Sequence, residues 1–93
     1  MQRIPIGVVL VLSLSACGMA DRDTRLKQLP GYPAANANCT QCHVLPFPPD
    51  RPAVAWAGIV TRMEALIRNS GRPVPDQATH DAIVQYFEAG ARL

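Results

Sequence analysis

The sequence shows no strand pattern, no internal repeat and no recognisable catalytic pair. No segment alternates apolar and polar residues over the length of a strand, so a sheet-based fold is excluded and an all-α fold is expected. The absence of a repeating unit also excludes a repeat architecture. No nucleophile–base pair and no paired carboxylates suggest independent catalysis, so we do not expect an enzyme.

Only one long apolar run is present, and it lies at the N-terminus. The stretch 4–14 is apolar except for three residues and follows a basic residue, Arg3. It is shorter than the ~20 residues that a membrane-spanning helix needs, so we interpret residues 1–16 as a secretory signal. The signal ends in Leu14-Ser15-Ala16-Cys17, which resembles the lipobox of bacterial lipoproteins. The alternative is an ordinary cleavage site with an incidental cysteine.

The lipobox resemblance implies that Cys17 is the first mature residue and carries a diacylglycerol on its sulfur. The protein would then lie in the periplasm, anchored to a bacterial membrane by two or three acyl chains. The mature chain, 17–93, has eight basic and seven acidic side chains, so no nucleic-acid partner is expected. A chain of this size has a marginal core of its own and gains from a cofactor or another covalent support.

The stretch Cys39-Thr40-Gln41-Cys42-His43 has the spacing of a c-type haem attachment site. The two thiols can each form a thioether with a haem vinyl group, and His43 can then bind the iron from one side. The alternatives are a redox disulfide and half of a zinc site. No strand–helix context precedes Cys39 to support a redox pair, and only His80 remains as a further zinc ligand. We therefore expect one covalent haem c.

The rest of the mature chain divides into a tether and one domain. Residues 17–31 are mostly polar and are expected to form a flexible tether with at most a short helix, and the domain spans 32–93. A helix is expected to start at Pro33 and to run into the haem motif. A loop with four prolines follows over 44–52. Two further helices are expected, over 53–68 and from an Asp76 cap to about residue 88 or 89, before Gly90.

The helix over 53–68 has a continuous apolar face at helical spacing, made of Trp56, Ile59, Val60, Met63, Leu66 and Ile67. Met63 is the only methionine after the haem motif. Because the haem would form the core of this domain, we expect Met63 to be the second axial ligand of the iron. The alternatives are a purely structural Met63, ligation by His80, which is expected to be solvated, and an open iron site.

The haem propionates are expected to need hydrogen-bond donors from the protein. Trp56 offers an indole N–H and Arg51 a charged guanidinium, and Trp56 lies on the same helix face as Met63. In the alternative, Trp56 only packs and Arg51 is solvated. In either case the Trp56 ring is expected to border the haem.

With these motifs, residues 32–93 resemble the class I cytochrome c family. The resemblance depends on the haem motif, the proline loop and the aromatic pair Tyr86-Phe87 of the last helix. The chain differs from the commonest family pattern because its 69–75 loop contains no methionine. Instead, Trp56-Ala57-Gly58-Ile59-Val60-Thr61-Arg62-Met63 is similar to a Trp-x-x-x-Val-x-Arg-Met pattern in a smaller subgroup, which includes haem subunits of periplasmic dehydrogenases.

The resemblance and the two expected axial ligands, His43 and Met63, imply a single-electron carrier that works between periplasmic redox enzymes or respiratory complexes. One alternative is a fixed haem subunit of a periplasmic dehydrogenase. The other is a haem sensor or gas-binding module with an open sixth position.

Overall fold

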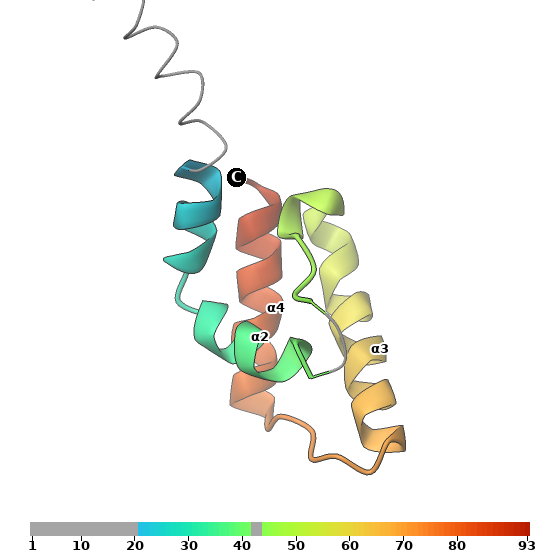
Figure 1. Ribbon diagram of the computed structural model, residues 1–93. Helices are drawn as coiled ribbons and strands as arrows, with labels where there is room; N and C mark the ends of the chain where they lie inside the picture. The colour runs from blue at the N-terminus through green and yellow to red at the C-terminus, as the bar shows by residue number, and fades with distance from the viewer. Residues whose placement is uncertain (1–20, 42–43) are drawn as a thin grey trace, which may run out of the picture.

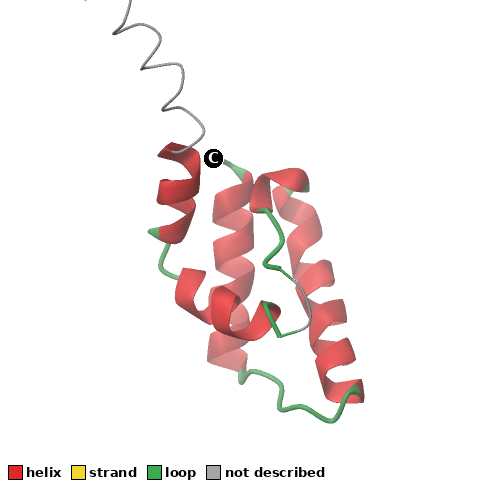
Figure 2. Ribbon diagram, in the orientation of Figure 1, coloured by secondary structure: helices red, strands yellow, loops and turns green. Residues whose placement is uncertain are grey.

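A computed structural model describes residues 21–41 and 44–93, and this part of the chain is mostly helical and contains no strand. A helical segment over 21–27 precedes α2 (Tyr32–Cys39), the short 3₁₀ helices η1 (Pro48–Asp50) and η2 (Ala53–Ala55), α3 (Trp56–Asn69) and α4 (Gln77–Ala91). Figures 1 and 2 show the helices gathered around α4. The expectation of an all-α fold is confirmed.

The core lies around α4, which contacts α2, α3, η1 and η2. Its Phe87 is fully buried and stacks on Trp56 of α3, with 4.3 Å between the ring centroids and 17° between the planes. Tyr86 meets Phe87 edge-on and approaches Tyr32 of α2 with 5.8 Å between ring centroids. These rings join three helices through contacts that add to the free energy of plain apolar burial.

Capping residues that can be identified in the sequence determine where α3 ends and where α4 begins. Gly71 takes a left-handed backbone conformation (φ 81°), and its N–H donates to the Arg68 carbonyl while that of Arg72 donates to Ile67. This is the Schellman arrangement, and it ends α3. The Asp76 side chain accepts a 2.8 Å hydrogen bond from the Thr79 N–H and begins α4. Both predicted boundaries are confirmed to within a residue.

Gly90 does not end the last helix, as the sequence had suggested, because α4 continues to Ala91. Gly90 is buried, and a Cβ added to it would lie 2.7 Å from Pro48 Cβ and 2.8 Å from Leu26 Cδ2. The glycine therefore permits two segments to pack directly against the α4 backbone. The absence of a side chain at Gly90 lets Pro48 and Leu26 approach α4 closely, and it does not end the helix.

The segment expected to be a flexible tether over 17–31 differs from that expectation in its described part. Residues 21–27 are helical, and the side chain of Leu26 is only 3% exposed. Gly31 is also buried, with its Cα so close to α4 that an added Cβ would collide with the Ala82 carbonyl. The segment packs on α4 mainly through Leu26 and Gly31. Two residues in a polar stretch do not form a pattern, so the sequence did not predict this packing.

The apolar face predicted for α3 is partly correct. Trp56, Val60 and Ile67 are buried, and Ile59 and Met63 are partly buried against the core. Leu66 is the exception, with 64% of its surface exposed, because α4 and the loop cover a narrower stripe than the sequence pattern suggested. The first turn of the predicted 53–68 helix is the 3₁₀ turn η2.

Candidate functional site

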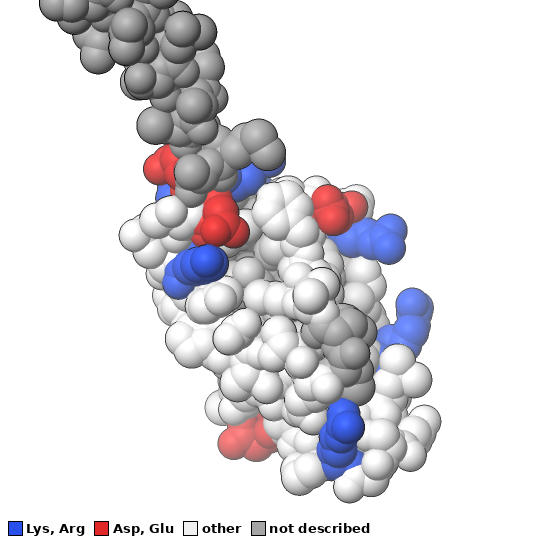
Figure 3. Space-filling model, in the orientation of Figure 1, with Lys and Arg blue, Asp and Glu red and all other residues white. Residues whose placement is uncertain are grey.

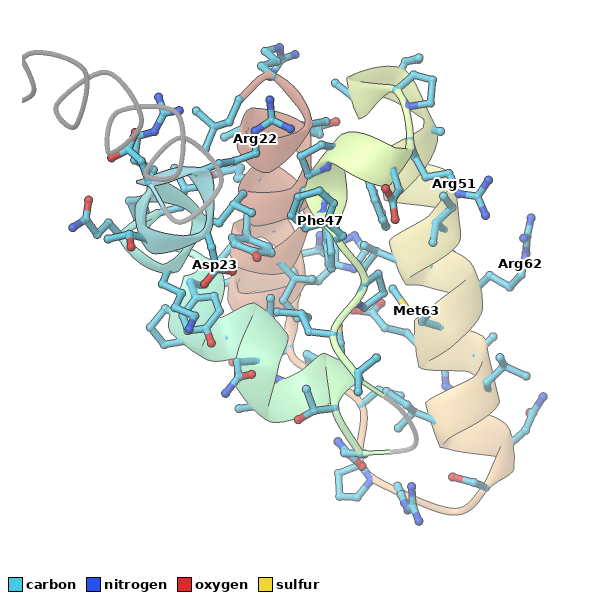
Figure 4. All side chains as sticks on the ribbon, turned by 45° about the horizontal axis from the view of Figure 1, so that its top comes forward. Arg22, Asp23, Phe47, Arg51, Arg62 and Met63 are labelled. Carbon is cyan, nitrogen blue, oxygen red and sulfur yellow. The ribbon has the colours of Figure 1, made fainter. Side chains whose placement is uncertain are left out.

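A groove of about 600 Å³ lies between the proline loop and the first half of α3. Its volume is within the range of cofactor sites, about 300–1,000 Å³. Its lining is mostly apolar, with two arginines: Pro46, Arg51, Pro52, Ala55, Trp56, Ile59, Arg62 and Met63. Figure 4 shows Met63 between α3 and the loop, with Arg51 and Arg62 extending outward at the edge.

Met63 is placed in the groove by helical periodicity. It lies seven residues after Trp56, which is two turns of helix or about 10.5 Å along the axis. Both side chains therefore line the same groove, and Met63 also packs against the buried core. Thioether sulfur is a soft ligand that suits haem iron. The sequence prediction that Trp56 and Met63 share one face of this helix is confirmed.

The groove wall opposite α3 is an irregular segment stabilised by its prolines. Residues 44–47 have no regular structure, and Pro48–Asp50 form one 3₁₀ turn, closed by an Asp50 N–H to Phe47 carbonyl bond of 3.0 Å. Proline removes backbone donors and fixes φ, so this stretch cannot continue as an α-helix. A long irregular loop was expected here, and one short turn is the only regular element.

Trp56 is 2% exposed, and its indole N–H donates a 3.0 Å hydrogen bond to the Pro48 carbonyl. That bond links the start of α3 to the proline loop and satisfies the only donor of the ring. The prediction that this N–H serves a propionate is therefore not supported, because a carbonyl of the chain already accepts it. The arrangement matches the alternative in which Trp56 packs, although its ring still lines the groove.

The two arginines at the groove are exposed, so their guanidinium groups are free to move within the reach of their side chains. Arg51 follows η1, and Arg62 lies on α3 directly before Met63. The sequence reasoning proposed Arg51 for anionic groups and did not consider Arg62. The sequence did contain an indication that Arg62 belongs to the site, because this residue is part of the Trp-x-x-x-Val-x-Arg-Met pattern.

Cys39 is the last residue of α2 and is half-buried against the core. Loss of solvent, reinforced by the negative charge of Glu64, raises the pKa of its thiol to about 11. Cys39 and Met63 pack against the same buried core. The other predicted attachment residues, Cys42 and His43, lie outside the described residues, as does Cys17.

His80 is not solvated as expected. Its Nδ1 lies 2.8 Å from Oε1 of Glu64, and the two side chains are only 22% and 15% exposed. This contact joins α3 to α4. The Glu64 side chain is therefore directed toward α4. His80 does not line the groove, whereas Met63 does, so Met63 is the better placed of the two for an iron bound there.

Figure 3 shows acidic and basic side chains close together near the top of the molecule and several separate basic side chains along one side. In the described parts of the chain, none of the helices is both long and apolar enough to cross a membrane. Comparisons with protein-family models, curated protein sequences and solved structures returned no match.

Proposed function

We propose that this chain is a monohaem c-type cytochrome that carries single electrons and is attached to a bacterial membrane by a lipid on Cys17. The main support is that the only methionine downstream of the Cys-x-x-Cys-His motif lines a cofactor-sized groove. The motif itself begins at the end of α2, on a half-buried cysteine.

The residues present are suited to haem. Cys39 and Cys42 would hold it covalently, and His43 and Met63 would serve as axial ligands. The groove is lined mainly by apolar side chains, which suit a porphyrin face, and its two exposed arginines suit anionic propionates. The bound group would supply a centre that accepts and donates one electron.

The protein side chains then determine what that centre can do. His43 and Met63 would both bind the iron, so the iron would not be open to a substrate or to oxygen. Methionine ligation raises the reduction potential relative to a bis-histidine site. The Trp56–Pro48 hydrogen bond holds the proline loop against α3 and so fixes the two walls of the groove relative to each other. These properties favour electron transfer over catalysis.

A first experiment tests the iron ligands. The protein, produced in cells that attach haem to exported cytochromes, should show a covalent haem and, when oxidised, the far-red band of methionine–iron ligation. The ferrous form should not bind carbon monoxide. Ready binding of carbon monoxide by the wild type would favour the sensor alternative. Copurification of a large dehydrogenase subunit in stoichiometric amount would favour the fixed-subunit alternative.

A second experiment tests attachment. Replacing Cys39 or Cys42 by Ala should leave one thioether at most, and replacing both should leave none. The double variant should lose all haem on acid–acetone extraction and should accumulate poorly, because its core is incomplete. Haem that survives extraction in the double variant would rule out the proposed attachment.

A third experiment tests the anchor independently of the haem. Cys17→Ser should prevent lipidation and either release the protein into the soluble periplasm or leave the signal uncleaved. Mass spectrometry of the wild type should find the acyl chains on residue 17. A wild type that is soluble without detergent and begins at another residue would contradict the lipid anchor and leave the haem proposal intact.

A further inference from the structure

The N-terminal segment (residues 21–31) lies along α4 as an integral part of the domain. Leu26 packs on Gly90 near one end of α4, and Gly31 packs on Ala82 and Tyr86 about two turns earlier. The segment therefore runs antiparallel to α4 over eight residues, or about 12 Å. Figure 1 shows the blue helical segment that begins the described part of the chain beside the C-terminal end of α4.

Both contacts of this segment are tight. The side chain of Leu26 is 3% exposed, and an added Cβ at Gly90 would lie 2.8 Å from its Cδ2. Leu29 also packs against the core, and the N–H of Tyr32 donates 3.0 Å to the Leu29 carbonyl, which closes the turn into α2. Releasing the segment would expose one leucine fully and part of a second, so release is unfavourable.

The docking changes how far the domain can lie from a lipid on Cys17. A free tether from residue 17 to residue 31 could reach about 50 Å when fully extended, at 3.3–3.6 Å per residue. With Leu26 docked on α4 and residues 21–27 helical, residue 21 has a fixed place in the domain, and only four peptide units separate it from residue 17. They span at most about 14 Å, whatever their conformation.

Charge does not oppose an approach to a lipid surface. The 21–27 stretch has three basic and two acidic side chains. Each acidic residue is paired with a basic one four positions later, Asp21 with Arg25 at 3.2 Å and Asp23 with Lys27 at 3.4 Å. Arg22 remains at the same end, so an anionic bilayer would not be repelled.

From this geometry we infer that the bilayer surface is the binding partner of the end of the domain formed by residues 21–25 and the last turn of α4. This inference depends on the proposed lipid at Cys17. The docked segment holds the domain on the membrane, so its electron partners are themselves membrane-bound or reach the domain at the membrane surface.

The test uses the lipidated full-length protein in a supported bilayer, with the gap between lipid headgroups and protein measured by neutron reflectometry. We expect a gap of no more than about 14 Å for the wild type. Leu26→Asp should release the segment and widen the gap to about 20 Å, the span of a flexible coil from residue 17 to residue 31. A Gly/Ser insertion between residues 20 and 21 should widen the gap without disturbing the domain. Gln28→Ala, at an exposed neighbouring position, is the matched control.

Trypsin provides a second measurement, made on the haem-loaded protein, that does not need the lipid. Cleavage after Arg25 and Lys27 should be at least about tenfold faster in Leu26→Ser than in the wild type, because cleavage requires local opening. Serine is used here because an acidic residue beside the cleaved bond slows trypsin itself. If lipidated wild type stands as far from the bilayer as Leu26→Asp, the inference is wrong and the proposed cytochrome stands. If residue 17 carries no acyl chain, the anchor fails and the membrane inference fails with it. A trypsin rate equal in Leu26→Ser and the wild type would overturn the docking itself.

Discussion

The ring nitrogen Nδ1 of His80 lies between both carboxylate oxygens of Glu64, 2.8 Å from Oε1 and 2.9 Å from Oε2. The contact joins α3 to α4. Burial and, to a lesser extent, the negative charge of the same Glu64 raise the pKa of the Cys39 thiol. The contact occupies only Nδ1 of His80, so the role of this histidine has to be tested separately from that of Met63.

His80→Ala should destabilise the domain without altering the iron. It leaves a part-buried carboxylate without its partner, at a cost of about 1–3 kcal/mol in the free energy of unfolding measured with urea. His80→Asn, which keeps a donor near the position of Nδ1, should recover part of the loss. A His80→Ala variant that becomes high-spin would instead identify His80 as the iron ligand.

Met63→Leu should produce the opposite pattern. The side-chain volume is nearly kept, so stability should change by less than about 1.5 kcal/mol. Without the sulfur, the covalent haem should lose its far-red band, its reduction potential should fall, and its ferrous form should bind carbon monoxide. Leu66→Ala, at an exposed position one turn along α3, is the control and should change none of these. An unchanged spectrum in Met63→Leu would exclude Met63 as a ligand.

Trp56→Phe separates packing from hydrogen bonding. The stack on Phe87 is kept, whereas the Pro48 carbonyl loses its donor. Urea unfolding should show a loss of about 1–3 kcal/mol, and Trp56→Ala a larger loss of about 3–5 kcal/mol. If the N–H instead served a propionate, Trp56→Phe would shift the reduction potential with little effect on stability.

Two glycines in helices should respond to alanine in opposite directions. Gly58→Ala on α3 adds a Cβ with nothing within 4 Å, so it should stabilise the domain by about 0.5–1 kcal/mol through helix propensity. Gly90→Ala places a Cβ 2.7 Å from the Cβ of Pro48, an atom that cannot move without moving the backbone. This substitution should destabilise the domain by about 1–3 kcal/mol. Thermal unfolding of both variants tests this. If Gly90→Ala changed the stability as Gly58→Ala does, Pro48 and Leu26 would not be packed tightly on Gly90 in solution.

Alkaline pH should destabilise the fold through Tyr86. Burial, together with the nearby Tyr32 and Asp23, raises the pKa of its phenol to about 12. The folded state therefore holds this proton more tightly than the unfolded state, whose value is near 10. The contribution to stability is complete below pH 10 and is lost as the pH rises from about 10 to about 12. The urea midpoint of Tyr86→Phe should fall less over this range than that of the wild type.

The sequence predicted the helices where local signals were strong. Pro33, the Asn69-Ser70-Gly71 stop and the Asp76 cap act within one turn of backbone, so their effects can be predicted without knowing the tertiary structure. The same holds for Trp56 and Met63, which share a helix face by periodicity alone.

Contacts between distant segments were not predictable in this way. Gly90 resembled a helix end because the sequence does not show that Leu26 and Pro48 pack against it. The single leucine in the 21–27 stretch gave no periodic pattern, so its docking on α4 was missed. The pairing of Glu64 with His80 spans sixteen residues and depends on how α3 crosses α4.

The position of α4 in the chain has a consequence for the order of events during biogenesis. Helices α2 and α3 and the turns η1 and η2 all pack on residues 77–91, and all of them precede those residues in the chain. None of them can complete its packing until α4 is in place. The core against which Cys39 is half-buried contains Ile83, Tyr86 and Phe87 of this last helix. In the proposed cytochrome, the Cys39 thiol would therefore stay open to haem attachment until the end of the chain has been made and has docked.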